Sequence, residues 1–203
     1  MKKYKNIIFD MGNVLLDYAP HTIVSNFTSD TESINTLVKE VFYQQEWLDL
    51  DQGILGYDDA YILFKKRLHP KYHSLVKDIL DHWHEYLFER YEMFELLSEL
   101  KQLGYKLYLF SNASLRFYEY ENRIKCLSLF DQKIIYADLK YSKPSDDFYL
   151  KAFELCGISA QDSFFIDDSA INILKANQLG LDGYIYNSTY SLLYDYLKRI
   201  EVL

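Results

Sequence analysis

Short apolar runs that alternate with amphipathic helical patterns limit the fold of this chain more than any other feature. Apolar runs of this length, bounded by polar residues, are typical of buried strands. When strands and helices alternate, the strands pair in parallel and helices cover both faces of the sheet. We therefore expect an α/β fold with a Rossmann-like parallel sheet. The expected strands span residues 7–9, 106–110, 163–166 and 183–186, with a weaker fifth over 133–136.

Glycines mark the ends of three helices expected between these strands. A glycine just after the last helical turn adopts the left-handed conformation that commonly ends a helix. The second half of the chain therefore has well-defined helix limits. The helices predicted over 92–103, 145–156 and 171–179 are followed by Gly104, Gly157 and Gly180.

The region from about residue 20 to residue 88 breaks this alternation, because it contains helical patterns and no convincing strand. Ser29 and Glu32 have the spacing of a capping box, which marks the start of a helix. Aromatic residues on the apolar stripes that follow are expected in the core rather than at a ligand. The stripes, at helical spacing, are Ile34, Leu37, Val38, Val41 and Phe42, then Tyr72, Leu75, Val76, Ile79, Leu80 and Trp83.

Two domains are predicted from this interruption. Residues 1–17 and 89–203 form the α/β core, and residues 18–88 form an all-helical cap inserted after the first strand. A chain of 203 residues with 49% hydrophobic side chains is large enough for one sizeable core and a small appended domain.

Charge and cysteine content exclude several classes of partner. A formal net charge of −8 is the wrong sign for a protein that binds nucleic acid or an anionic membrane surface. Cys126 and Cys156 lie outside any metal-binding pattern, and we interpret them as reduced core thiols. No stretch approaches the ~18 apolar residues of a membrane span. The default expectation is a soluble cytoplasmic protein.

Polar residues stand where the predicted strands end, at the edge where parallel sheets collect their functional groups. Each has a commonplace explanation when taken alone, as a helix cap, a turn residue or a surface charge. Their order and placement together indicate one site. They are Asp10 after the first strand, Ser111 and Asn112 after the second, Lys143 in a later loop, and Asp167 and Asp168 after the strand over 163–166.

These groups together suit phosphoryl transfer from a small phosphorylated metabolite to water. A carboxylate such as Asp10 can attack phosphorus and divide hydrolysis into formation and breakdown of an aspartyl phosphate. Its repulsion from a phosphate dianion is offset by Mg²⁺, held by Asp10 and a carboxylate at the end of the 163–166 strand. Lys143 adds a second positive charge. Ser111 and the backbone donors around Asn112 can hold the phosphoryl oxygens.

Four ordered segments carry a family resemblance: 7–14 (IIFDMGNV), 107–112 (LYLFSN), 142–144 (SKP) and 164–168 (FFIDD). In this order they resemble the motifs of the haloacid dehalogenase superfamily, and the resemblance covers nearly the whole chain. The helical insert looks like the cap domain with which that family closes its active site. The pattern is especially similar to a bacterial subgroup that includes an α-D-glucose-1-phosphate phosphatase, which implies a sugar phosphate as substrate.

The resemblance also implies a role for each matching residue. Asp10 becomes the nucleophile and a magnesium ligand, Asp168 the second acidic ligand, and Gly12 a ligand through its backbone carbonyl. The remaining assignments are Ser111, Asn112 and Lys143 as contacts of the phosphoryl group, with Asp167 and Asn172 holding waters or orienting the metal ligands.

Gly12 departs from the pattern of the family's phosphatases, which have at this position an aspartate that protonates the leaving group and later activates water. General acid–base catalysis contributes about 10²- to 10⁴-fold in rate, so we expect a slow enzyme unless something compensates. One compensation is an acidic leaving hydroxyl, as in a sugar 1-phosphate. The other is a titratable group of the insert or its hinges, such as Asp17 or His21, that arrives when the cap closes.

Other activities fit the sequence less well. Hydrolytic dehalogenation uses the same aspartate without a metal, and the adjacent Asp167 and Asp168 disfavour it. A phosphomutase depends on the missing acid at position 12. The alternative from a different class is a non-catalytic phosphate-binding or regulatory protein. In that case Gly12 reflects the loss of catalytic activity. The physiological substrate and the oligomeric state are left open.

Overall fold

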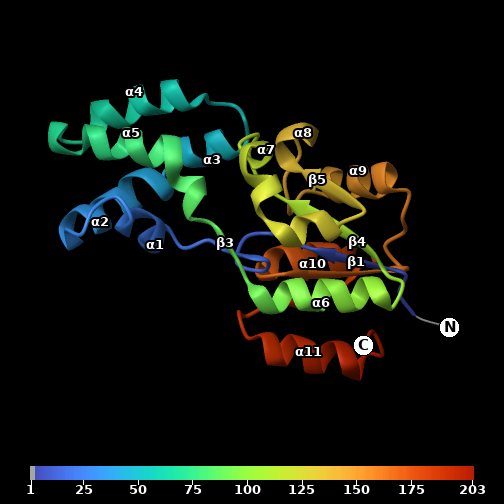
Figure 1. Cartoon of the computed structure of the whole chain (residues 1–203). Helices are drawn as coiled ribbons and strands as arrows, with labels where there is room; N and C mark the ends of the chain where they lie inside the picture. The colour runs from blue at the N-terminus through green and yellow to red at the C-terminus, as the bar shows by residue number, and fades with distance from the viewer. Residues whose placement is uncertain (1–2) are drawn as a thin grey trace.

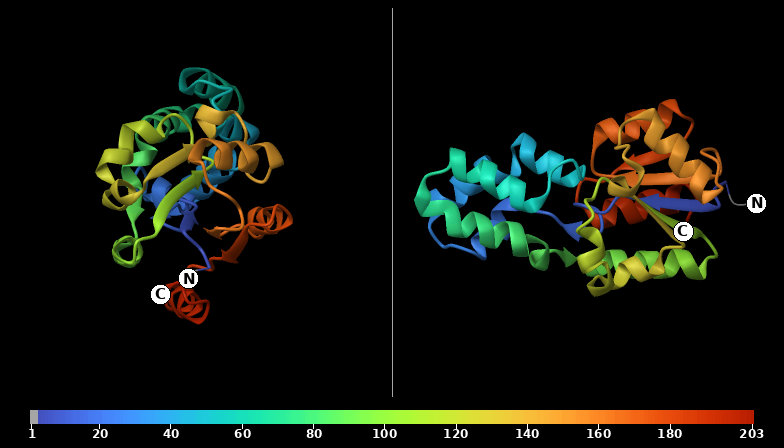
Figure 2. Two further views of the ribbon diagram at one scale, coloured as in Figure 1. Left: turned by 90° about the vertical axis from the view of Figure 1, so that its right-hand side faces the viewer. Right: turned by 90° about the horizontal axis from the view of Figure 1, so that it is seen from above.

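The computed structural model describes residues 3–203 and contains a parallel five-stranded sheet (Figures 1 and 2). Its strands are β1 (Asn6–Phe9), β4 (Lys106–Ser111), β5 (Gln132–Ile135), β6 (Ser163–Asp167) and β7 (Asp182–Ile185). The order β5-β4-β1-β6-β7 changes direction at the central strand β1. Open α/β sheets bind ligands at such a switch point. The predicted strands are thus confirmed, with limits that differ by a single residue.

Helices cover both faces of the sheet, because alternate strand residues point to opposite sides. Ile7 and Phe9 belong to the apolar cluster that contains α6 (Tyr91–Gln102) and α11 (Tyr190–Arg199). Ile8 between them belongs to the cluster that contains α9 (Asp146–Cys156) and α10 (Ala170–Gln178). The predicted Rossmann-like α/β fold is therefore confirmed.

The glycine-terminated helices end where the sequence indicates. Gly157 caps α9 with a φ of 63° and donates its N–H to the Glu154 carbonyl. Ser145 begins the same helix, and its side chain accepts from the Phe148 N–H. Gly104 and Gly180 have φ of 85° and 79° after α6 and α10. Helices without such signals were not predicted: α7 (Phe117–Tyr120), α8 (Tyr136–Leu139) and α11.

Residues 20–86 form a helical lobe beside the sheet, as Figure 1 and the right-hand view of Figure 2 show. The predicted stripe residues Val41, Ile79 and Leu80 are buried within it. The lobe contains α1 (Pro20–Ser25), α2 (Thr31–Leu37), a π-helix (Val38–Phe42), α3 (Gln45–Asp51), α4 (Tyr57–Arg67), a 3₁₀ helix (Pro70–Tyr72), α5 (His73–His82) and a second 3₁₀ helix (Trp83–Tyr86).

The predicted capping box at the start of α2 is wrong. Asp30 is the N-cap, and its carboxylate accepts hydrogen bonds from the Ser33 N–H at 2.9 Å and the Ser33 hydroxyl at 2.6 Å. Glu32 is exposed. The Asp30 carboxylate therefore takes the position that the sequence assigned to Ser29, because aspartate is among the strongest N-cap residues.

Two short antiparallel strands join the lobe to the rest of the chain. They are β2 (Leu16–Asp17) and β3 (Phe88–Glu89), which pair Leu16 with Glu89 and Asp17 with Phe88. The predicted domain boundaries fall at the end of β2 and inside β3, and the division into core and cap stays a prediction. Residues 1 and 2 of the predicted core lie outside the described residues.

No helix within residues 3–203 is long and apolar enough to cross a membrane. Both cysteines are free: Cys126 is buried and Cys156 is half-buried. The interpretation of both as thiols therefore agrees with the structure, although Cys156 lies nearer the surface than expected.

Candidate active site

Three neighbouring strands bring the predicted acidic and hydroxyl side chains to one edge of the sheet. Phe9 of β1 pairs with Leu109 of β4 and with Ile166 of β6. The residues that follow these positions, Asp10 and Asp167, are therefore level with one another, and Ser111 ends β4 beside them. All three are buried, and Asp167 is 0% exposed.

Lys143 places its ammonium group between the two buried carboxylates. Its Nζ donates to Asp10 Oδ1 and to Asp167 Oδ2, both at 2.7 Å, and its side chain is 1% exposed. Burial by itself lowers the pKa of Lys143, but the charges of Asp10 and Asp167 raise it above its ordinary value. The lysine is therefore a fixed positive charge at the centre of the site.

Asn112 holds the backbone of Lys143 in place. Its Nδ2 donates to the Lys143 carbonyl and its Oδ1 accepts from the Lys143 N–H, both at 2.9 Å. The side chain of Asn112 is thus engaged with the lysine loop, while its predicted contact with the phosphoryl group stays a prediction. The peptide bond that follows, Lys143–Pro144, is cis.

Asp167 is held by three protein contacts besides the lysine. Its Oδ1 accepts from the Ser169 N–H at 2.8 Å, and Asn172 Nδ2 lies 3.0 Å from each carboxylate oxygen. A buried carboxylate without partners is costly, and these donors satisfy it. That Asp167 and Asn172 hold waters or orient the metal ligands stays a prediction.

Asp10, Asp167 and Asp168 form an acidic cluster that fits a divalent cation. One carboxylate oxygen from each lies within 4.8 Å of the others. Burial raises the pKa of Asp10 to about 7; the charge of Lys143 opposes this shift and that of Asp167 adds to it. Burial also raises the pKa of Asp168. Because Mg²⁺ prefers oxygen ligands and few carboxylates, the donor set suits this ion.

Asn13 orients Asp168, a contact that the sequence did not indicate. Asn13 Nδ2 donates to Asp168 Oδ2 at 3.2 Å, and Asn13 Oδ1 accepts from the Tyr18 N–H at 3.3 Å. Its φ is 56°, in the left-handed region, where asparagine is found more often than most other residues. The one sequence signal for Asn13 was its place in the motif of residues 7–14.

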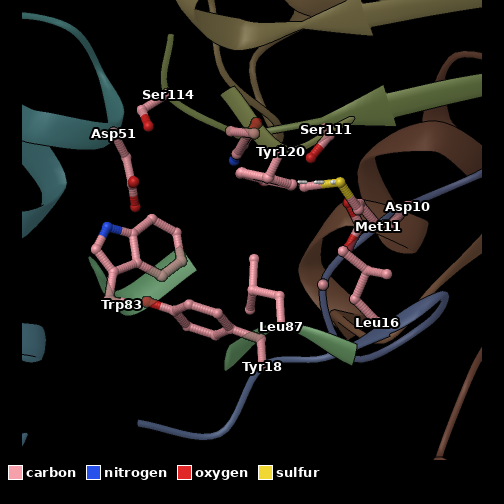
Figure 3. A pocket seen from close by; sticks show the side chains of 13 residues that line it. Asp10, Met11, Leu16, Tyr18, Asp51, Trp83, Leu87, Ser111, Ser114 and Tyr120 are labelled. Carbon is pink, nitrogen blue, oxygen red and sulfur yellow. Dashed lines mark hydrogen bonds between the residues drawn. The ribbon is translucent and has the colours of Figure 1, made fainter. Parts of the chain in front are cut away.

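A cavity of about 160 Å³ lies between the acidic cluster and the helical lobe (Figure 3). Gly12 lines it beside Asp10, and a Cβ built on Gly12 would meet only Tyr18 Cβ at 3.9 Å, so a side chain fits there. The cavity is lined by Asp10, Met11, Gly12, Leu16, Tyr18, Asp51, Trp83, Leu87, Ser111, Asn112, Ala113, Ser114 and Tyr120.

Asp17 and His21, the residues expected to compensate for Gly12, do not line this cavity. Asp17 pairs with Arg90 at 2.7 Å, and His21 is exposed. Trp83 does line it, although the sequence placed this residue only in the core; it also packs on Trp47 with ring centroids 5.3 Å apart. The helical lobe supplies one acidic group instead, Asp51, whose pKa burial raises to about 7.

Comparison with known proteins agrees with this geometry. A family model described as haloacid dehalogenase-like hydrolase matches residues 4–180. A sesquiterpene phosphatase of Aspergillus oryzae is 27% identical over 186 residues, which cover 89% of this chain and 88% of that protein.

Solved structures share the fold. A HAD family enzyme from Bacteroides thetaiotaomicron, in complex with magnesium and inorganic phosphate, has a TM-score of 0.73 and 24% identity, covering 94% of this chain and 99% of its own. The L-2-haloacid dehalogenase of Xanthobacter autotrophicus, with chloropropionic acid covalently bound, has a TM-score of 0.66 and 17% identity, covering 89% and 76%. With the family model spanning most of the sequence, the chain belongs to the haloacid dehalogenase-like hydrolase family.

Proposed function

We propose that this hydrolase is a magnesium-dependent phosphatase that acts on a small phosphomonoester through Asp10. The observation that carries the proposal is the position of Asp10, which lies at the end of the cavity, bonded to Lys143 and next to Asp168. Such a carboxylate has one side open to a substrate and a fixed cation on the other.

In the first step, a carboxylate oxygen of Asp10 attacks phosphorus and the bond between phosphorus and the alcohol oxygen breaks. The departing alkoxide takes a proton from solvent, because Gly12 offers no carboxyl group. Water then attacks phosphorus of the aspartyl phosphate, which releases inorganic phosphate and restores Asp10. The catalytic residues in this proposal are Asp10, Ser111 and Lys143.

The ligands proposed for magnesium are Asp10, Asp168 and the carbonyl of Gly12. When bound, the ion supplies positive charge that favours ionised Asp10 and offsets its repulsion from the phosphoryl oxygens. Asp167 stays outside this set because Lys143, Ser169 and Asn172 occupy its oxygens. Ser111 and the backbone near Asn112 remain the proposed donors to the phosphoryl group, and the helical lobe the proposed cap.

A panel of phosphate esters tests this function. The purified chain is incubated with each ester and magnesium, and phosphate release is compared with that of Asp10→Asn and with a sample containing chelator. We expect release by the wild type only, and only with magnesium. Sugar phosphates, the substrate class that the family resemblance implies, belong in the panel. Equal release from every ester by wild type and Asp10→Asn contradicts the proposal.

A phosphate-binding or regulatory protein is the second candidate, favoured by Gly12. Position 12 has room for a side chain but no acid, so the usual proton transfer is missing. Magnesium-dependent binding of inorganic phosphate without turnover of any ester supports this alternative.

A further inference from the structure

The end of the cavity opposite Asp10 is lined by a carboxylate and an aromatic side chain. Figure 3 shows Asp51 and Trp83 across the pocket from Asp10 and Ser111. If the phosphoryl group of a substrate binds at Asp10, its organic part faces this opposite end. The groups that line the far end therefore select the leaving alcohol.

Asp51 lacks a counter-charge. Burial raises the pKa of its carboxyl, and no lysine or arginine of residues 3–203 offsets that shift. The carboxylate sits at the last residue of α3, where the negative end of the helix dipole disfavours an anion. Asp51 lines the cavity together with Tyr18 and Tyr120, and its charge adds to burial in raising the pKa of both tyrosines.

Arg116, on the loop beside the cavity, is engaged elsewhere. Its Nη1 donates to the Asp81 carbonyl at 2.6 Å, and its guanidinium lies 3.8 Å from the ring centroid of Tyr57. Arg116 is therefore not the counter-charge of Asp51, and a cationic ligand could take that place.

Three aromatic side chains, from different parts of the chain, share the cavity with Asp51. Tyr18, Trp83 and Tyr120 line the same cavity, with ring centroids of Tyr18 and Trp83 6.0 Å apart and those of Trp83 and Tyr120 6.5 Å apart. A cavity that combines aromatic ring faces with one carboxylate can bind an organic ammonium, through cation–π attraction and charge.

We propose that the substrate is the phosphate ester of an alcohol that carries a quaternary ammonium, with Asp51 as its counter-charge and Tyr18, Trp83 and Tyr120 as its aromatic walls. This inference rests on the proposed phosphatase function and names its substrate class. It also gives a role to the uncompensated charge of Asp51.

One other role for this end of the cavity fits less well. A general acid must lie within hydrogen-bond reach of the leaving oxygen. Asp51 lies across the cavity from Asp10 (Figure 3). It therefore faces the far end of the leaving alcohol rather than the leaving oxygen.

The test compares two esters of the same shape, phosphocholine and 3,3-dimethylbutyl phosphate, in which a carbon replaces the charged nitrogen. With magnesium present, we expect the wild type to have a kcat/KM at least about tenfold higher for phosphocholine. Asp51→Asn should abolish that preference. Asp58→Asn, which removes an exposed carboxylate of the helical lobe, should keep it. The inference is overturned if the wild type hydrolyses both esters without preferring phosphocholine, or if Asp51→Asn slows both esters equally.

Binding of the free alcohols separates this inference from the proposed function. Choline and 3,3-dimethylbutan-1-ol cannot be hydrolysed, and their binding to the wild type is measured by tryptophan fluorescence. Tighter binding of choline, lost in Asp51→Asn, supports the ammonium site even if no ester is turned over. Equal binding of the two alcohols overturns it even if phosphatase activity is found.

Discussion

Replacing Lys143 by methionine removes the ammonium group that pairs with two buried carboxylates. Lys143 Nζ lies 2.7 Å from both Asp10 Oδ1 and Asp167 Oδ2, and the lysine side chain is 1% exposed. Removing one partner of a buried ion pair typically costs about 3–5 kcal/mol, because a buried charge is left uncompensated. We expect the free energy of unfolding of Lys143→Met at pH 7 to fall by about this amount.

The loss of unfolding free energy in Lys143→Met should depend on pH and on magnesium. Burial already raises the pKa of Asp10, and without Lys143 that pKa rises further. A carboxyl whose folded pKa is raised takes up a proton on folding, so the variant regains stability as the pH falls from 7 towards 5. Magnesium, as a replacement cation, should stabilise the variant more than the wild type.

Urea unfolding at pH 7 and pH 5, with and without magnesium, measures these effects. Lys151→Met is the control, since it removes an exposed lysine paired with Glu154, a kind of ion pair worth about 0–1 kcal/mol. A loss below about 1 kcal/mol for Lys143→Met at pH 7, similar to that of the control, refutes the stabilising role of the buried lysine between two carboxylates.

Three further predictions follow from single contacts. Gly12→Asp, which fits the space beside Tyr18, should raise kcat on alkyl phosphates by up to about 10²-fold by supplying a general acid; Gly12→Ala is the control, and no gain for the aspartate contradicts the reasoning. Asn112→Ala removes both hydrogen bonds to the Lys143 backbone and should lower stability by about 1–3 kcal/mol, together with kcat; wild-type values in urea unfolding and kinetics refute this role. Desolvation raises the pKa of Asp131, but Lys101 and Lys106 help to lower it to about 2. The ionised carboxylate therefore stabilises the fold above pH 3.8, and this contribution is lost as the pH falls through 2. Asp131→Asn should cost about 1–2 kcal/mol at pH 7, discounted for partial exposure, and urea unfolding near pH 2 should no longer detect the difference.

The sheet and the acidic end of the site were predictable because they depend on short-range patterns. A strand buried on both faces, such as Ile7 to Phe9, is apolar at every position. Parallel strands then bring the residues after them to one edge, so Asp10, Ser111 and Asp167 come together whatever the loops do.

The opposite end of the cavity was not predictable. Asp51 lies in a helix of the lobe, and its position facing Asp10 depends on how the lobe packs against the sheet, which no local pattern encodes. The same holds for Trp83. Its position on an apolar stripe correctly predicted burial, but did not indicate that the side chain also lines the cavity. At the start of α2, Ser29 and Asp30 are both good N-caps, and only the backbone geometry decides between them.

The most direct test of Asp10 as nucleophile is to find the phosphoryl group on it. With an activated ester such as p-nitrophenyl phosphate, the first step needs no general acid. Breakdown of the aspartyl phosphate normally uses a general base, which Gly12 cannot provide. The aspartyl phosphate should therefore accumulate. The wild type is quenched in acid during turnover with magnesium, and its peptides are analysed by mass spectrometry. We predict a phosphorylated peptide modified at Asp10 and none in Asp10→Asn. Phosphate release by Asp10→Asn at the wild-type rate, or a phosphoryl group on another residue, contradicts the mechanism.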